Sequence, residues 1–391
     1  MRVLALGGAG EYGRDAVRIL ASSSLVSEIV VAGRNLEAAQ SYAKEVGAKA
    51  RGVSVDVSGR DKLIALARDC DIIVNTAGPE WETVLKVLDA AIAAGTNYCD
   101  IGADGPTTEA ALELDSGAKA KAVTALLGIG ACPGLATLMM LHAARQLDRV
   151  EEVHSCVLAP ATAFGITRDV VSSYREAGRV STGWRMFMKW CTPPFHAYSD
   201  GKLATVKDET AEIQIAVPGN GEISAVLVGS TEALTIPRFV PEIQCVATLF
   251  SWFPFRLNGI YRELGGRVAK GEFDESQAAL AFLDQVLSEE GRGQSAPSGL
   301  LMGTRWAEAV GTKDGKRARY TCWPAGWFRP NPTPVALALA ALKILSGEIG
   351  IDGVLTPESC LDPLPFFKEV ASAQLKTDEP GKLLNEAWQT L

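Results

Sequence analysis

The chain has 391 residues, of which 47% are hydrophobic and 21% charged, and its formal net charge at pH 7 is -8. This composition is typical of a folded globular protein, and the length exceeds what one hydrophobic core usually spans, so we expect two domains. A negative charge without a Lys/Arg cluster excludes binding to nucleic acid or to an anionic membrane through bulk electrostatics.

The cysteines and the apolar runs indicate a cytoplasmic protein. The eight cysteines are scattered, with no C-x-x-C pair and no histidine at metal-ligand spacing, so we expect reduced thiols and no metal site. Met1 runs directly into a strand-like stretch, which leaves no room for a signal peptide. The most apolar stretch, residues 123–144, contains three glycines and a proline. It therefore predicts a buried strand, a tight turn and a helix rather than a transmembrane segment.

The first 130 residues alternate short β-branched runs with longer amphipathic stretches, the pattern of βαβ units on a parallel sheet. Six runs are predicted as strands: residues 3–6, 29–32, 52–55, 72–75, 97–100 and 124–127. Residues 80–94 carry apolar side chains at helical spacing and are predicted as a crossover helix. We therefore expect a Rossmann domain, a doubly wound parallel α/β sheet, over residues 1–130.

Residues 131–330 are expected to form an inserted, mixed α+β domain for substrate binding and dimerisation. Strand-like pieces occur at residues 153–158, 212–217 and 223–229, and a hairpin turn is expected at residues 313–316. Six of the eight tryptophans lie between residues 184 and 327, where they could line a pocket or an interface. Residues 331–391 begin with an Ala/Leu-rich helical run, and we expect this segment to return to the Rossmann domain.

Residues 245–261 are unusually rich in apolar and aromatic side chains. Four interpretations are open: a lid, a dimer contact, a membrane-surface patch or ordinary core packing. Core packing is favoured, because large apolar residues are most often buried.

The first predicted strand runs into a complete G-x-G-x-x-G motif, Gly8-Ala9-Gly10-Glu11-Tyr12-Gly13, which is preceded by Gly7 and followed by a predicted helix. In this position the first glycine permits a tight turn, the second lets backbone approach a pyrophosphate, and the third lets the helix pack on the strand. The helix N-terminus offers free N–H groups to the phosphates. The motif therefore predicts a dinucleotide site.

The end of the second predicted strand favours NADP over NAD. NAD sites place an Asp or Glu there, whereas this chain has Arg34 followed by Asn35. An arginine can hold a 2'-phosphate and stack on adenine. Asp56, after the third strand, is expected near the adenine. The segment Thr76-Ala77-Gly78-Pro79, after the fourth strand, is expected to border the ribose and nicotinamide.

Several segments in order resemble the saccharopine dehydrogenase-like family of NADP-dependent oxidoreductases. They are Gly7-Gly8-Ala9-Gly10-Glu11-Tyr12-Gly13-Arg14, Ala32-Gly33-Arg34-Asn35, Asn75-Thr76-Ala77-Gly78-Pro79, residues 90–100 (A-A-I-A-A-G-T-N-Y-C-D), Gly130-Ala131-Cys132-Pro133-Gly134, Thr235-Ile236-Pro237-Arg238 and residues 357–363 (P-E-S-C-L-D-P). The stretch at residues 90–100 is the most specific of these.

The resemblance implies reversible formation of a secondary amine, in which an amine condenses with an aldehyde or keto acid and NADPH reduces the imine. Saccharopine reductase, carboxynorspermidine dehydrogenase and lysine dehydrogenase are relatives of this kind. The true saccharopine reductases have L-D-P-G where this chain has Ala131-Cys132-Pro133-Gly134, so the resemblance does not imply saccharopine as the substrate.

Candidates for proton transfer lie at strand ends, where open α/β sheets bind ligands. Tyr98 and Asp100 share one face of the fifth strand by period-two alternation, and Asp104 follows. The structural alternative is that Tyr98 fills the core while Asp100 caps a loop or helix. Cys132 could face the nicotinamide, although a buried apolar thiol is the commoner role. His154, in a strand opening the second domain, is the reserve acid or base.

Two other functions remain open. One is an NADP-dependent carbonyl reductase, for which we expect no Tyr-x-x-x-Lys pair that could carry the acid–base chemistry. The other is a non-catalytic nucleotide sensor or membrane-surface protein on a Rossmann fold, because a fold does not guarantee a function. The leading hypothesis is an NADP(H)-dependent, homodimeric oxidoreductase acting on a C–N bond of an amine, amino acid or carbonyl substrate.

Overall fold

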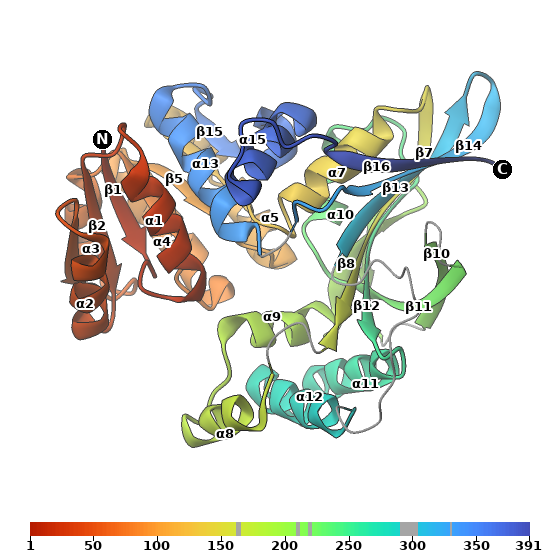
Figure 1. Ribbon diagram of the computed structural model, residues 1–391, viewed down its shortest axis with the longest axis horizontal. Coiled ribbons are helices and arrows are strands. Elements are labelled where there is room, and N and C mark those ends of the chain that lie inside the picture. The colour runs from red at the N-terminus through yellow and green to blue at the C-terminus, as the bar shows by residue number, and fades with distance from the viewer. Residues whose placement is uncertain (162–165, 209–211, 218–220, 290–303, 329–330) are drawn as a thin grey trace. The chain divides into compact units, whose positions relative to one another are not determined.

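The computed structural model describes the following residues: 1–161, 166–208, 212–217, 221–289, 304–328 and 331–391. They divide into two compact units (Figure 1). Unit 1 holds Met1–Leu138 and Gly326–Leu383, and unit 2 holds Met139–Ala325 and Leu384–Leu391.

Unit 1 is built on a seven-stranded parallel sheet in the order β15-β6-β5-β4-β1-β2-β3. The strands are β1 (Arg2–Leu6), β2 (Glu28–Gly33), β3 (Ala50–Ser54), β4 (Ile72–Asn75), β5 (Asn97–Asp100), β6 (Thr124–Leu126) and β15 (Gly353–Leu355). The central strands are buried on both faces, as parallel sheets require. All six predicted strands are present, and the predicted Rossmann-type α/β fold is confirmed. The seventh strand comes from the C-terminal segment.

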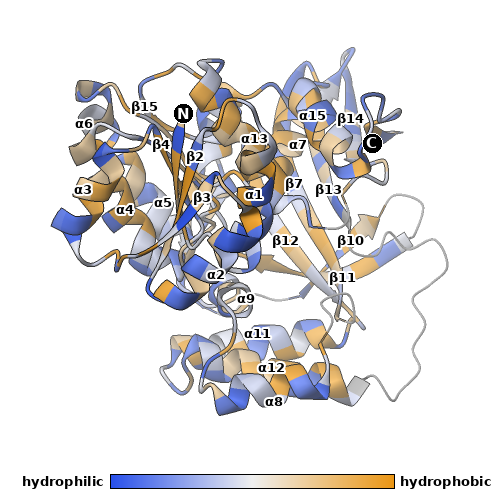
Figure 2. Cartoon of the chain, turned by 60° about the vertical axis from the view of Figure 1, so that its left-hand side comes forward, coloured by the Kyte–Doolittle hydropathy of each residue, from blue (hydrophilic) through white to orange (hydrophobic). Residues whose placement is uncertain are grey.

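Helices cover both faces of this sheet. They are α1 (Glu11–Ser22), α2 (Leu36–Val46), α3 (Arg60–Arg68), α4 (Glu80–Ala94), α5 (Gly105–Leu112), α6 (Asp115–Ala120), α13 (Thr333–Ser346), α14 (Pro357–Cys360) and α15 (Pro363–Leu375), and α7 (Leu135–Ala144) runs on from this unit. Helix α13 packs against α1, and α3 packs against α4. Figure 2 shows apolar colour concentrated on the strands and polar colour on the outer sides of the helices. Helix α4 has the predicted bounds.

Unit 2 contains a nine-stranded mixed sheet with the main order β10-β11-β12-β7-β13-β14-β16, and β8 and β9 pair beside β12. The strands are β7 (Arg149–Pro160), β8 (Phe195–Ser199), β9 (Lys202–Val206), β10 (Glu212–Val217), β11 (Gly221–Val228), β12 (Cys245–Phe253), β13 (Thr304–Lys313), β14 (Lys316–Pro324) and β16 (Leu384–Thr390). Its helices are α8 (Arg168–Glu176), α9 (Thr182–Trp190), α10 (Glu232–Thr235), α11 (Leu257–Ala269) and α12 (Glu275–Glu289). The β13–β14 turn places Asp314 and Gly315 at positive φ, as expected for the predicted hairpin.

The end of the chain differs from the sequence-based expectation. We expected all of residues 331–391 to accompany the Rossmann domain, but β16 pairs antiparallel with β14 in the second sheet. Trp388 of this strand packs edge-to-face on Tyr320, with ring centroids 4.9 Å apart. The physical reason is that β14 would otherwise present an unpaired edge, and a short alternating segment can satisfy its N–H and C=O groups.

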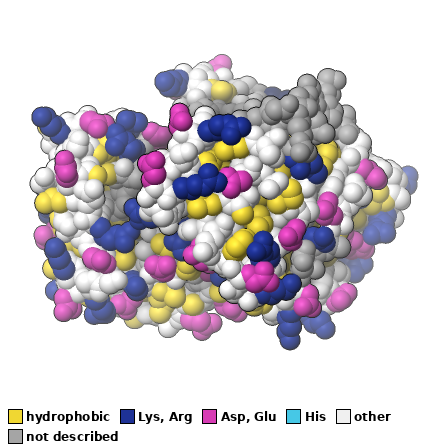
Figure 3. Space-filling model, turned by 90° about the horizontal axis from the view of Figure 1, so that it is seen from below, with side chains coloured by type: hydrophobic (Ala, Val, Ile, Leu, Met, Phe, Trp, Pro, Cys, Tyr) yellow, Lys and Arg dark blue, Asp and Glu magenta, His cyan; other side chains and the backbone are white. Residues whose placement is uncertain are grey.

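The aromatic stretch at residues 245–261 is largely core. Phe250 and Trp252 of β12 are fully buried and pack against Trp184, Phe187 and Tyr261. Among the described helices, none is both long and apolar enough to cross a membrane. On the face shown in Figure 3, basic and acidic side chains are interspersed with apolar ones rather than gathered by sign.

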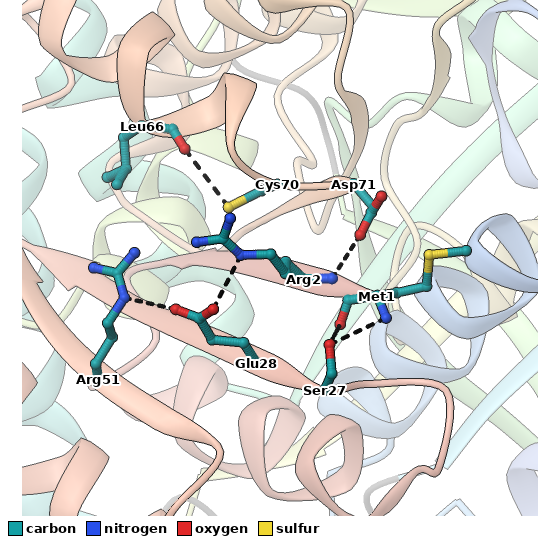
Figure 4. A network of polar contacts seen from close by, with 8 residues as sticks. All are labelled: Met1, Arg2, Ser27, Glu28, Arg51, Leu66, Cys70 and Asp71. Carbon is teal, nitrogen blue, oxygen red and sulfur yellow. Dashed lines mark hydrogen bonds and ion pairs between the residues drawn. The ribbon is translucent and has the colours of Figure 1, made fainter.

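A polar network joins the amino-terminal ends of the first strands (Figure 4). Glu28 accepts from Arg51 at 2.7 Å and pairs with Arg2 at 3.0 Å, so one carboxylate links β1, β2 and β3. Asp71 accepts the backbone N–H of Arg2 at 2.6 Å. The hydrogen bond from Arg51 holds the pKa of Glu28 below its usual value. This edge is opposite the one where the glycine motif lies.

We expect Glu28→Gln to lower the free energy of unfolding at neutral pH by no more than about 1 kcal/mol, because exposed ion pairs contribute little. Since the pKa of Glu28 is lowered in the folded state, the difference should shrink as the pH falls below the ordinary carboxyl range. Urea unfolding at neutral and acidic pH measures both effects. A larger loss at acidic pH than at neutral pH would contradict this account.

Candidate functional site

The glycine motif forms a tight turn between β1 and α1. Gly7 has φ +71°, a conformation that favours glycine, and its N–H donates to the Ala32 carbonyl at 2.8 Å. A Cβ on Gly7 would lie 2.7 Å from the backbone N of Ala77, in the loop after β4. The glycine turn and the β4 loop are thus in backbone contact.

Gly13 lets α1 start against this turn. A Cβ on Gly13 would lie 2.3 Å from the Gly7 carbonyl oxygen and 2.8 Å from Thr76 Oγ1. Gly10 is exposed, and a Cβ on it would have only the Gly7 oxygen near it, at 3.0 Å. Because the first-turn N–H groups of a helix have no intrahelical partner, the turn forms a backbone cradle for a pyrophosphate. The residues present therefore fit a dinucleotide.

The predicted 2'-phosphate and adenine residues lie together at the ends of β2 and β3. Arg34 is exposed, and Ser54 Oγ donates to its carbonyl oxygen at 3.3 Å. Asn35 Oδ1 accepts the Ala38 N–H at 3.0 Å and caps α2. The pKa of Asp56 is lowered, first by a hydrogen bond from the Ser58 N–H and also by the charge of Arg34. Within the described residues Arg34 forms no ion pair, which leaves its guanidinium available to a phosphate.

The loop after β4 is fixed by hydrogen bonds to its neighbours. Both the N–H and the hydroxyl of Thr76 donate to the Leu6 carbonyl, at 2.8 and 3.0 Å. Thr83 Oγ1 of α4 donates to the Ala77 carbonyl at 2.7 Å. The segment Thr76-Ala77-Gly78-Pro79 therefore lies against the glycine turn, in the position expected for residues that border a ribose.

Tyr98 and Asp100 form a buried hydrogen-bonded chain with Asn75. Asn75 Nδ2 donates to the Tyr98 hydroxyl at 3.0 Å, and that hydroxyl donates to Asp100 Oδ2 at 2.7 Å. Asp100 Oδ1 accepts the N–H groups of Gly102 and Gly128, at 2.9 and 2.7 Å. Tyr98 is fully buried and Asp100 is 1% exposed.

Burial raises the pKa of both groups, and the hydrogen bonds to Asp100 oppose this for its carboxyl. The shared strand face was predicted, and the buried geometry gives these side chains the task of holding the loops that follow β5 and β6. A role for either side chain in proton transfer stays a prediction.

The other candidates are spread over the chain. Asp104 accepts from the N–H and hydroxyl of Thr107 and caps α5. Cys132 is partly buried in the turn between β6 and α7. His154 lies on β7 of unit 2, with Nε2 3.6 Å from Glu152 Oε2; burial lowers its pKa and Glu152 opposes this. Asp104 and Asp100 are near one another, whereas a role for His154 in the same site stays a prediction.

Sequence reasoning missed Glu80, the first residue of α4. Glu80 Oε1 accepts the backbone N–H of Ala103, in the loop after β5. Burial raises its pKa to about 8, and the charges of Asp104 and Asp100 add to the rise. In the sequence, an acidic residue after a proline looks like an ordinary first-turn helix charge. The loop that contains Ala103 lies next to Glu80 only in the folded chain.

Comparison with known proteins identifies the domain that carries this turn. Residues 3–126 match the family model described as the saccharopine dehydrogenase NADP binding domain. The match covers about a third of the chain and all but the last strand of the parallel sheet in unit 1. The predicted resemblance and the predicted NADP-binding domain are thus confirmed. The whole chain is similar in fold to apo saccharopine dehydrogenase (L-Glu forming) from Saccharomyces cerevisiae, with a TM-score of 0.64 and 17% identity over 99% of each chain.

Two curated proteins are similar over a shorter region. They are the phosphoribosylamine–glycine ligases of Xanthomonas campestris pv. campestris and Xanthomonas axonopodis pv. citri. Each is 36% identical over 129 residues, which is 33% of this chain. The alignment spans 27% of each ligase, about a quarter of its length.

Proposed function

We propose that this protein is an NADP(H)-dependent oxidoreductase of the saccharopine dehydrogenase type. Its reaction is reduction of an imine formed from an amine or amino acid and an aldehyde or keto acid, or the reverse oxidation of a secondary amine. The observation that carries the proposal is the glycine turn, in which Gly7 and Gly13 admit no side chain, within a domain of that family. We also propose that residues of unit 2 contact the substrate. A further proposal is that the protein is a cytoplasmic homodimer.

Different segments of unit 1 are proposed to bind different parts of NADP(H). The glycine turn and the α1 N-terminus would hold the pyrophosphate, Arg34 would hold the 2'-phosphate, and Asp56 would lie near the adenine. When bound, NADPH supplies the hydride. The protein then has to orient the imine carbon and handle one proton.

Imine formation expels water, so a proton donor beside the reacting carbon accelerates it by about 10²- to 10⁴-fold. Glu80 is suited to donate, because a carboxyl with a raised pKa keeps its proton near neutral pH. Tyr98 and Asp100 are positioning residues in this scheme, since they fix the loops at Gly102 and Gly128. Asp104, Cys132 and His154 remain candidates for contact with the substrate.

The carbonyl reductase alternative is less well supported. Contrary to the expectation from the sequence, a Tyr-x-x-x-Lys spacing does occur, at Tyr198 and Lys202, but it spans the turn between β8 and β9. Side chains four residues apart share a face in a helix, not across a hairpin. Tyr198 also donates its hydroxyl proton to the Gly201 carbonyl at 2.8 Å.

The membrane-surface alternative requires an exposed apolar patch at residues 245–261, and burial of Phe250 and Trp252 disfavours it. The ligase activity named for the Xanthomonas proteins is not carried over, because the alignment covers a third of this chain.

The test is NADPH oxidation with a panel of amine and carbonyl pairs, each component also being assayed alone. We expect oxidation only when both components are present, with the secondary amine identified by mass spectrometry. Oxidation by a carbonyl compound alone would overturn the C–N assignment in favour of carbonyl reduction. Failure of the protein to bind NADPH at all would overturn the oxidoreductase proposal itself.

A further inference from the structure

Glu80 joins the two loops that follow neighbouring strands of the Rossmann sheet. It is the first residue of α4, directly after the β4 loop, and its carboxyl accepts the Ala103 N–H from the β5 loop. Thr83, one turn on, fixes the β4 loop through the Ala77 and Pro79 carbonyls, at 2.7 and 3.1 Å. The carboxyl group is therefore held at the carboxyl end of β4 and β5, where such sheets bind ligands.

The charged groups that act on Glu80 are acids, whereas hydrogen bonds from the backbone N–H groups of Ala103 and Asp104 favour its ionised form and lower its pKa. Asp104 at the start of α5 and Asp100 at the end of β5 both raise its pKa, and burial raises it most. Of the cations on α3, which packs against α4, Arg60 pairs with Asp89 of α4 at 2.7 Å. Lys86 of α4 itself donates to Ser58 Oγ at 3.3 Å. The charges of Asp104 and Asp100 therefore favour the protonated form of Glu80.

The position of Glu80 relative to the cofactor follows from the fold and rests on the proposed function. A dinucleotide crosses the sheet at the β1 turn, where the strand order reverses, with one mononucleotide over each half. Arg34 and Asp56 assign the adenosine half to β2 and β3. The nicotinamide half then lies over β4 and β5, the side on which Glu80 is held.

We propose that Glu80 couples the oxidation state of the cofactor to a proton: it stays a neutral carboxylic acid in the free protein and with NADPH, and ionises when NADP⁺ binds. The oxidised nicotinamide ring carries a positive charge that the reduced ring lacks. A positive charge beside a carboxyl favours its ionised form. The O–H bond of Glu80 breaks, the electron pair stays on the carboxylate, and the proton passes to solvent. NADP⁺ binding therefore releases a proton that NADPH binding does not.

The test is calorimetric titration of the wild-type protein with NADP⁺ and with NADPH at several pH values between about 6 and 8.5, which bracket the pKa of Glu80. Repeating each titration in two buffers of different ionisation enthalpy counts the protons released. NADPH carries the same phosphate groups, so their titration cancels in the ratio of the two dissociation constants. We expect NADP⁺ affinity relative to NADPH to rise with pH by up to about tenfold per unit below pH 8.

Glu80→Gln should remove both the proton release and the pH dependence of that ratio. Glu82→Gln, an exposed change on the same helical turn, should leave both intact. Equal pH dependence for the two nucleotides in the wild type overturns the inference while leaving the proposed function standing. Binding of neither nucleotide overturns the proposed function, and the inference falls with it. Should Glu80→Gln fold poorly, the wild-type proton count decides the question alone.

Discussion

Asp100→Ala is expected to lower the free energy of unfolding by about 3–5 kcal/mol, the largest stability effect that we predict for the site. The carboxylate accepts three hydrogen bonds, from the Tyr98 hydroxyl and from the N–H groups of Gly102 and Gly128. Alanine leaves all three donors without an acceptor, of which those of Tyr98 and Gly128 are buried and that of Gly102 is partly buried. The cost is large because an unmet buried donor loses its full solvation in water.

Asp100→Asn is the matched control. Its side-chain oxygen can still accept from the two glycine N–H groups, so we expect a loss of about 1–2 kcal/mol. Tyr98→Phe should cost about as much, since it removes one buried hydroxyl bonded to Asn75 and Asp100. Urea unfolding of the three variants gives these values. An alanine variant as stable as the asparagine variant would show that Asp100 does not hold the loops.

Gly13→Ala is expected to weaken nucleotide binding at least about 100-fold and also to destabilise the fold, because overpacking against backbone cannot be relieved by side-chain rotation. The new Cβ would lie 2.3 Å from the Gly7 oxygen and 2.7 Å from Gly8 Cα. Both atoms belong to the phosphate-binding turn. The helix must therefore shift away from the strand, and the cradle opens.

Gly10→Ala is expected to weaken nucleotide binding while leaving the free energy of unfolding almost unchanged. Its φ is -82°, and its Cβ would approach only the Gly7 oxygen, at 3.0 Å, so the fold should lose no more than about 1 kcal/mol. The methyl group nevertheless occupies the surface that a pyrophosphate must approach, and nucleotide binding should fall as it does for Gly13→Ala. Gly117→Ala, whose nearest neighbour would be Ile92 at 3.9 Å, should change neither quantity appreciably. Unimpaired NADPH binding by Gly10→Ala would contradict the assignment of the turn.

The parallel sheet could be read from the sequence because its strands are buried on both faces. Short apolar runs flanked by turn residues, such as residues 29–32 and 72–75, are typical of strands in the interior of a parallel sheet. The glycine motif was also informative: its third glycine, Gly13, leaves no room for a side chain, and neither does Gly7, which precedes the motif. The face shared by Tyr98 and Asp100 followed from alternation alone.

Features that depend on the meeting of distant segments could not be predicted. Glu80 becomes a half-buried acid only because the loop at Ala103 folds over the start of α4. The sequence of β16 looks like a polar C-terminal tail, and its strand structure depends on pairing with the edge of β14. In both cases the local sequence is ordinary, and the neighbour that determines its role lies elsewhere in the chain.

The most direct test of the account is a fluorescence titration of the wild-type protein and an Arg34→Glu variant with NADPH and NADH. Arg34 is exposed beside Asp56, free to hold the phosphate that distinguishes the two nucleotides. We expect the wild type to bind NADPH at least about tenfold more tightly than NADH, and Arg34→Glu to lose that preference. Arg18→Glu, an exposed change on α1, should keep it. Preference for NADPH that survives in Arg34→Glu would contradict the assigned 2'-phosphate site, and binding of neither nucleotide by the wild type would contradict the account as a whole.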